Sequence, residues 1–221
     1  MNRRPHIYVL NPNSSQIVTD GLDRAVQPLR LADGPAISCL RLPQGPAGVQ
    51  SQTDIDTLIP HLRAQALSVK EDAAAYVVAC FSDPGLYTLR EAVDVPVLGI
   101  AETGVLTALS LGQRFGVLSI LQASIPRHLR YFGAMGVTDR LAADLAINMG
   151  VSELADEKKA LQRLTEVGQR LRDEHGADVV VLGCAGMANQ REALEQALGI
   201  AVVEPTQATV AVALGRCLLG W

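Results

Sequence analysis

The chain has 221 residues, a formal net charge of −4 and a hydrophobic share of 48%. This weak acidity and the absence of any Lys/Arg-rich stretch exclude the electrostatic footprint of a nucleic-acid-binding protein. No apolar run reaches the roughly 18 residues of a membrane span, and the start of the chain leads into a strand pattern rather than a signal-peptide core, so we expect a cytoplasmic protein without membrane contact.

Strand and helix patterns alternate along the whole chain and predict an α/β fold built on parallel sheets. In the first half, strands are predicted at 7–10, 36–42, 74–80 and 97–100, and helices at 14–29, 54–70 and 85–93. In the second half, strands are predicted at 115–120, 140–145, 179–184 and 201–203, and helices at 104–111, 125–134, 153–175, 190–198 and the C-terminus.

Two segments in different halves of the chain, 76–85 and 179–188, are almost copies of each other. Each is an apolar strand pattern rich in β-branched residues that ends on a cysteine, Cys80 in the first and Cys184 in the second. This duplication predicts two pseudo-symmetric lobes, each a mainly parallel sheet with flanking helices, and an active site in the cleft between them. We expect lobe 1 to comprise residues 1–98 plus 207–221, and lobe 2 to comprise residues 99–206.

The two strand-end cysteines are the candidate catalytic residues, because ligands of open α/β folds bind at the carboxyl edge of the sheet. A thiol just ahead of a helix N-terminus meets the helix dipole and free backbone N–H groups, which predicts a pKa lowered toward neutrality. Two thiols on opposite faces of one carbon supply the base and the acid of a racemase. Free cysteines are otherwise usually small core residues, which is how we interpret Cys39 and Cys217.

Further candidates lie at the same strand ends. We expect Asn11 to bind a substrate carbonyl, since it closes the first strand. Removal of a proton next to a carbonyl puts negative charge on the oxygen, which preorganised donors stabilise. Ser82, Ser119 and the backbone N–H groups of Ala185 and Gly186 are the predicted donors.

Two acidic residues have roles that the sequence leaves open. Asp83 either caps a helix or acts in the site, and Glu102 either faces the cleft or begins the next helix. Asn13 is interpreted as a helix cap. No metal is expected, because the cysteines form no C-x-x-C pair and the histidines have no ligand spacing. The histidines interpreted as structural are His6, His61, His128 and His175.

Segments 79–86 and 182–188, together with 11–14, 96–102 and 114–118, resemble the cofactor-independent aspartate/glutamate racemase superfamily and, within it, the hydantoin racemases. In hydantoin and allantoin racemases the first two of these segments hold the catalytic cysteines. The resemblance therefore implies that Cys80 and Cys184 are the base and the acid, which exchange roles with the handedness of the substrate. It also implies two α/β lobes, no cofactor and a homo-oligomer.

The chain departs from the hydantoin racemase pattern in two places. Ile120 follows Ser119 where family members often carry two hydroxyl residues, and the segment 144–150 differs from the usual one. These departures bear on the identity of the substrate more than on the type of reaction.

The sequence thus predicts racemisation of a small-molecule substrate, a 5-substituted hydantoin or allantoin, by two-thiol proton transfer. One alternative is an amino-acid racemase or a maleate-type isomerase on the same scaffold, which the absence of Arg or Lys at these strand ends disfavours. The other is a non-catalytic protein that binds a small metabolite in the cleft. Incorporation of solvent deuterium at the substrate carbon distinguishes an enzyme from this last alternative.

Overall fold

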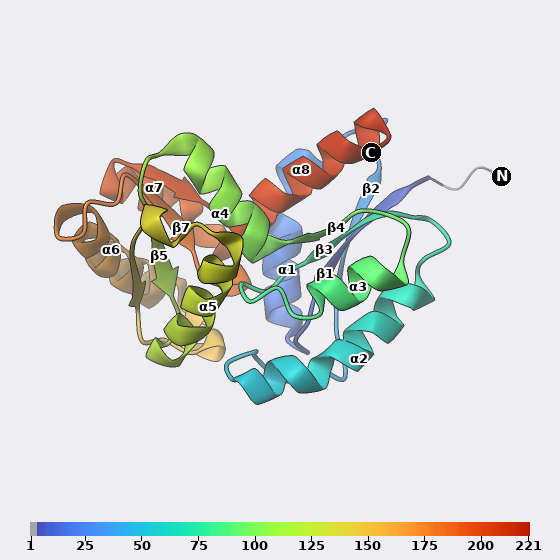
Figure 1. The fold of residues 1–221 in the computed structure, drawn as a ribbon, viewed down its shortest axis with the longest axis horizontal. Helices are drawn as coiled ribbons and strands as arrows, with labels where there is room; N and C mark the ends of the chain where they lie inside the picture. Colours follow the sequence, from blue (N-terminus) through green and yellow to red (C-terminus); the bar gives the residue numbers. More distant parts are fainter. Residues whose placement is uncertain (1–3) are drawn as a thin grey trace.

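Two four-stranded sheets form the centre of the molecule, and helices cover them (Figure 1). The computed structural model describes residues 4–221, so the first three residues of the predicted lobe 1 lie outside it. Every strand pair is parallel, and the strand orders are the same in both sheets, β2-β1-β3-β4 and β6-β5-β7-β8. The predicted α/β class with two pseudo-symmetric lobes is confirmed.

The first sheet and its helices come from the first half of the chain. Its strands are β1 (His6–Asn11), β2 (Ala36–Arg41), β3 (Ala73–Val78) and β4 (Val97–Gly99). The helices around it are α1 (Gln16–Ala25), α2 (Gln52–Ser68) and α3 (Leu86–Ala92), with the 3-10 turn η1 (Gln27–Leu29).

The second sheet repeats this arrangement. Its strands are β5 (Phe115–Ser119), β6 (Leu141–Ala146), β7 (Val179–Leu182) and β8 (Ala201–Val203). Its helices are α5 (Ile125–Met135), α6 (Glu157–Asp173) and α7 (Arg191–Leu198). Its 3-10 turns are η2 (Gln122–Ser124), η3 (Thr138–Arg140), η4 (Val151–Ala155) and η5 (Ala185–Gln190).

Two helices join the sheets. α4 (Ile100–Leu111) runs from β4 to β5, and α8 (Pro205–Leu219) follows β8 but packs against α4 and against β3 of the first sheet (Figure 1). One hydrophobic cluster contains Val9 of β1, Val18 of α1 and Leu182 of β7. The two lobes therefore share part of their core.

The central strands have the sequence that a parallel sheet requires. All four residues of β7, Val179–Leu182, are buried, as are the last four residues of β3. Helices on both faces of a parallel sheet leave no solvated side, so continuous apolar runs are favoured over alternating ones. This physical reason makes the strands that carry the cysteines easy to recognise in the sequence.

α4 begins at Ile100, earlier than the predicted 104, because its cap comes from elsewhere in the chain. The carboxylate of Asp83 accepts the backbone N–H groups of Ala101 at 2.9 Å and Glu102 at 2.8 Å. Gly99, at the N-cap position, has no side chain to do this. Sequence patterns reveal local caps, whereas this cap lies on the loop after β3.

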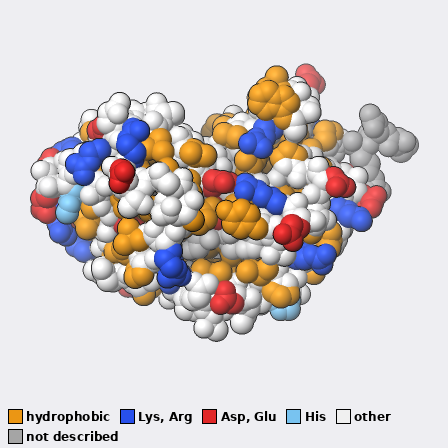
Figure 2. All heavy atoms as spheres, in the orientation of Figure 1, with side chains coloured by type: hydrophobic (Ala, Val, Ile, Leu, Met, Phe, Trp, Pro, Cys, Tyr) orange, Lys and Arg blue, Asp and Glu red, His pale blue; other side chains and the backbone are white. Residues whose placement is uncertain are grey.

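The surface carries charges of both signs. Figure 2 shows Lys and Arg side chains interspersed with Asp and Glu on one face, without a stripe of one sign. Within residues 4–221, no helix has the length and apolar character needed to cross a membrane.

Candidate active site

The two predicted catalytic cysteines lie just beyond the ends of the central strands, after Ala79 and after Gly183. Both line one small cavity between the lobes, with a volume of about 30 Å³. That volume is close to the share of one water molecule in the liquid, so the cavity is narrow. Duplication of a strand-end thiol therefore brings two thiols, one from each lobe, to the same enclosed space.

Three of the predicted substrate-binding residues also line this cavity. They are Ser82, Ala185 and Gly186, each within two residues of a cysteine in the chain. The backbone N–H of Gly186 donates to the sulfur of Cys184 at 3.4 Å. This donor favours a thiolate at Cys184.

Asn11 does not line the cavity, contrary to the sequence prediction. Its side-chain amide donates to Oδ1 of Asn13 and to Oγ1 of Thr19, both at 3.0 Å, and its Oδ1 accepts the backbone N–H of Asn13 at 3.3 Å. Asn11 is fully buried, whereas Asn13 lines the cavity. The polar atoms of Asn11 therefore hold the turn before α1, and Asn13 is the residue in reach of a ligand.

Ser119 is likewise fully buried and outside the cavity lining. Its hydroxyl donates to Oδ1 of Asp144 at 2.5 Å and lies 3.1 Å from Nδ1 of His128. The expectation that Ser119 contacts substrate does not agree with this placement, because the hydroxyl is engaged inside lobe 2. His128, in contrast, does line the cavity.

The sequence left two roles open for Asp83, a helix cap or a group of the site, and the structure shows the cap. This residue caps α4, as described above, and its Oδ2 also accepts the hydroxyl of Tyr131 at 2.8 Å. Burial raises the pKa of Asp83 to about 6, against hydrogen bonds that lower it. Glu102 begins α4 and accepts a hydrogen bond from Arg90 at 2.6 Å, away from the cavity.

The predicted lowering of the thiol pKa values is wrong. Burial and, to a smaller extent, the neighbouring Cys184 raise the pKa of Cys80 to about 12. Burial also raises the pKa of Cys184 to about 11, although the N–H of Gly186 opposes this. The free energy lost when a thiolate is removed from water is larger than the free energy gained from a hydrogen bond to one backbone N–H group. How well the cavity is shielded from water is not visible in a sequence.

Two residues near the cavity were missed from the sequence, His128 and Arg127. His128 has no ligand spacing to another histidine in the sequence, and Arg127 does not end a strand. The positive charge of Arg127 lowers the pKa of Cys80, against the effect of burial. A usable signal was present, because both residues lie in the first turn of the helix after β5, and such helices begin at the carboxyl edge of the sheet.

Arg127 and His128 also border a second hollow. This hollow, of about 250 Å³, is lined by Ser82, Arg127, His128 and Tyr131 among others. The Arg127 guanidinium donates to the carbonyl of Ala123 at 2.9 Å, whereas its buried Nε has no hydrogen-bond partner within residues 4–221. A cationic group therefore lies on the Cys80 side of the site.

A wider cavity of about 440 Å³ adjoins the small one on the other side. The two share Val18, Val151, Ala185 and Gly186 in their linings. Ile17 and Leu154 extend the apolar part of the wider cavity. This space is large enough to hold a substituent of a ligand bound at the cysteines.

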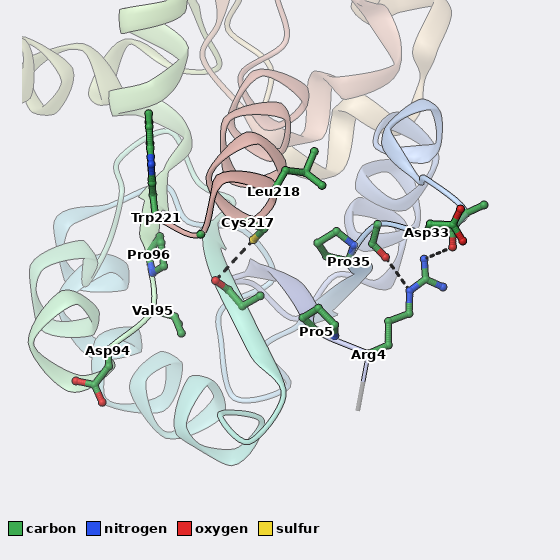
Figure 3. Close-up of a pocket in the computed structure, with 14 residues that line it drawn as sticks. Arg4, Pro5, Asp33, Pro35, Asp94, Val95, Pro96, Cys217, Leu218 and Trp221 are labelled. Atoms are coloured by element: carbon green, nitrogen blue, oxygen red, sulfur yellow. Dashed lines mark hydrogen bonds between the residues drawn. The ribbon is translucent and has the colours of Figure 1, made fainter. Parts of the chain in front are cut away.

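Another cavity, of about 770 Å³, has no residue in common with the small cavity. Figure 3 shows residues that line it, among them Arg4, Cys217 and Trp221. Its lining includes Pro5, Pro35 and Pro96, which precede strands β1, β2 and β4, so it lies at the amino edge of the first sheet. Cys217 lines it and donates to the carbonyl of Ala74 at 3.7 Å. None of the predicted site residues lines it, and ligands of such sheets bind at the opposite edge.

Among residues 4–221, no group of three or more His, Cys, Asp or Glu side chains is arranged to hold a metal ion. The polar side chains that line the small cavity carry two thiols, one imidazole, one hydroxyl and one amide.

Comparisons with known proteins define the class. The chain is 35% identical to a hydantoin racemase of Paenarthrobacter aurescens over 97% of its own length and 92% of that protein. It is 32% identical to a hydantoin racemase of Pseudomonas sp. (strain NS671), covering 92% and 82% of the two chains. The structure of an allantoin racemase from Klebsiella pneumoniae superposes with a TM-score of 0.91 at 27% identity, covering 98% and 89%. The protein is thus a racemase, which is an isomerase.

The family model described as Asp/Glu/Hydantoin racemase matches residues 7–213. This chain belongs to that family. Membership favours an enzyme over the non-catalytic binding protein that the sequence left as an alternative, and the predicted resemblance is confirmed.

Proposed function

We propose that this racemase interconverts the enantiomers of a 5-substituted hydantoin or of allantoin by proton transfer between Cys80 and Cys184. The observation that carries the proposal is the presence of both sulfurs, one from each lobe, at a single narrow cavity. Proteins similar to this chain include hydantoin racemases and an allantoin racemase. Asn13, Ser82 and the N–H groups of Ala185 and Gly186 are the proposed ring-binding groups.

In the proposed reaction, one cysteine is a thiolate and the other a thiol. The thiolate removes the proton from the ring carbon that bears the substituent, and the thiol donates its proton to the opposite face of that carbon. The adjacent carbonyl delocalises the charge of the carbanion, so a base of modest strength is sufficient. The opposite enantiomer reacts with the roles of the two sulfurs reversed.

Electrostatics disfavours the state in which both cysteines are thiolates. The charge of Cys184 raises the pKa of Cys80, which means that a second thiolate in the cavity is disfavoured once the first has formed. Burial opposes formation of any thiolate, as described above. One thiol and one thiolate is the arrangement that proton transfer between two faces requires.

The wider cavity next to the cysteines supports a substrate that carries a substituent. A hydantoin ring is larger than one water molecule, so the walls of the small cavity must move to admit it. The substituent then extends toward Ile17, Val151 and Leu154.

Replacement of the cysteines tests the proposal. We expect Cys80→Ser and Cys184→Ser each to reduce racemisation of both enantiomers by about a thousandfold or more, because serine is a much weaker acid than cysteine. Racemisation is followed by optical rotation with a series of 5-substituted hydantoins and allantoin. Each single variant is expected to retain exchange of the ring-carbon hydrogen with deuterated solvent for one enantiomer, measured by NMR.

Cys217→Ser is the matched control, since Cys217 lies at the opposite edge of the sheet, and its rate should equal that of the native protein. Undiminished turnover of the Cys80→Ser protein would remove the two-thiol mechanism. If the native protein exchanges the ring-carbon hydrogen of neither enantiomer of any hydantoin or of allantoin, the proposed substrate class is wrong.

Arg127 favours one further candidate for the same assay. Its unpartnered Nε and its charge beside Cys80 suit a substrate with a free carboxylate, which the sequence had disfavoured for lack of a cation. Aspartate and glutamate therefore belong among the substrates tested. Exchange of their α-hydrogen without exchange of any hydantoin would replace the proposed substrate class with an amino acid.

A further inference from the structure

Behind the cavity lies a buried polar cluster that neither the resemblance nor the proposed mechanism uses. Asp144 of β6 accepts two hydrogen bonds, one from the hydroxyl of Ser119 at 2.5 Å and one from Nδ1 of His128 at 2.8 Å. All three residues are less than a tenth exposed. Because the hydroxyl gives its single proton to Asp144, the carboxylate and the serine oxygen together hold a proton on Nδ1.

The other ring nitrogen of His128 is free to exchange a proton. Residues 4–221 offer Nε2 no hydrogen-bond partner, although the residue is only 3% exposed. His128 lines the cavity of the two cysteines, and its ring packs edge to face on Phe81, the residue after Cys80, with 5.2 Å between ring centres. A cavity of about 30 Å³ leaves room for about one water between its walls.

We propose that His128 is a catalytic residue, the base that converts the Cys80 thiol to its thiolate. The S–H bond breaks, the proton passes through one water molecule to Nε2, and the electron pair stays on sulfur. Asp144 stabilises the imidazolium that forms, and Ser119 holds Asp144 in place, so these two are positioning residues. The inference rests on the proposed function, because it states how one of the two thiols becomes the base.

The surroundings of Cys80 explain why such a base is needed. Burial and the charges of Cys184 and Asp83 oppose the thiolate, whereas the charge of Arg127 and the N–H of Ser82 favour it. Transfer of the proton to a neighbouring imidazole leaves an ion pair in the cavity rather than an isolated charge, which lowers the desolvation cost. A histidine whose far nitrogen is held by a carboxylate is a recurrent way to activate a nucleophile or base.

Alkylation of Cys80 by iodoacetamide tests the inference without any substrate. Its rate is measured in the full-length native protein and in His128→Gln between about pH 5 and pH 10, by mass spectrometry of the peptide that contains Cys80. We expect His128→Gln to slow alkylation at neutral pH by about tenfold or more and to move its midpoint to higher pH. Asp144→Asn should move the midpoint in the same direction by a smaller amount.

Two controls separate this effect from a general loss of structure. His61→Gln makes the same substitution at an exposed histidine of α2 and should leave the alkylation of Cys80 unchanged. The peptide that contains Cys39 provides an internal reference in every digest, and circular dichroism reports on folding. If His128→Gln does not fold, Asp144→Asn alone decides the outcome.

Equal rates and equal midpoints in the native protein and the folded variant would overturn the proposed role of His128. That result would leave the two-cysteine racemase intact, since the Cys80→Ser and Cys184→Ser experiments test it separately. Conversely, a shifted alkylation profile in a protein that exchanges no substrate hydrogen would contradict the proposed function and leave the thiol activation standing.

Discussion

Asp83 shows how burial changes the behaviour of one side chain. The residue has a positive φ of 42°, and its carboxylate accepts hydrogen bonds from two backbone N–H groups of α4 and from Tyr131 of α5. Few non-glycine residues adopt such a backbone conformation, although aspartate does so more readily than most. The bond to Tyr131 links the loop after Cys80 to lobe 2, so Asp83 supports the site without lining it.

The raised pKa of Asp83 predicts a dependence of stability on pH. Its folded value of about 6 lies above the ordinary 3.8, so the folded protein binds this proton more tightly than the unfolded chain does. The stabilisation is complete below about pH 4 and is lost as the pH rises through about 6, by an amount of about 3 kcal/mol. We expect the free energy of unfolding, measured with urea, to decrease over this interval by more in the native protein than in Asp83→Asn.

Asp33→Asn is the control for this measurement, because Asp33 is exposed. Its pH dependence should parallel that of the native protein. A parallel curve for Asp83→Asn as well would mean that Asp83 does not take up a proton in this range.

At the scale of the elements, the start of α4 has no local side-chain cap. It follows β4 without a turn, and the residue at its N-cap position is Gly99. A Cβ atom at position 99 would lie 2.2 Å from the Asp83 carboxylate, so the glycine is what allows the cap to approach. The connection between the lobes therefore depends on a close contact between two segments of lobe 1.

Gly99→Ala should destabilise the protein by about 2 to 4 kcal/mol, because the methyl group displaces the Asp83 cap from α4. The matched control is Gly215→Ala in α8, where an added Cβ meets no atom within 4 Å. That change should instead stabilise the protein by up to about 1 kcal/mol through helix propensity. Thermal and urea unfolding of both variants measure the effects, and a cost for Gly99→Ala no larger than about 0.5 kcal/mol would contradict the argument.

At the scale of the whole molecule, the two lobes are alike in topology but not independent. A hydrophobic cluster extends from β1 through α1 to β7, and α8 returns from the second sheet to pack on the first. The cavity with the two cysteines is lined in part by this cluster, through Val18, Ala79 and Ala185. Duplication thus provides two equivalent strand ends, and both of their cysteines line one cavity.

The shared core predicts that the chain unfolds in one cooperative transition. Calorimetry should give a single peak whose calorimetric and van't Hoff enthalpies agree, because neither lobe can lose its contacts without exposing the core of the other. Two separate peaks would show that each lobe is stable by itself. A ligand that binds between the lobes should raise the transition temperature while keeping a single peak.

Much of the architecture was predictable from local patterns. Strands such as Val179–Leu182 are continuous apolar runs, and the matching cysteines after two of them mark the same edge of two sheets. Such features depend mainly on neighbours in the chain, because strand geometry and burial on both faces act over a few residues. The family follows from the same segments.

The pKa values and the hydrogen-bond partners of the site residues depend on the tertiary structure. Asn13 rather than Asn11 lines the cavity, because the side chain of Asn11 is bonded to Asn13 and Thr19. The His128 imidazole meets Asp144 because α5 and β6 pack together. The raised pKa values of both cysteines come from shielding by two lobes at once.

The sequence by itself therefore determined the fold class, the duplication and the pair of strand-end thiols. Only the tertiary structure decided which polar groups accompany those thiols and how strongly they hold their protons. The physical reason is that secondary structure follows local apolar patterns, whereas charge, burial and hydrogen bonding at the site depend on side chains that are distant in the chain.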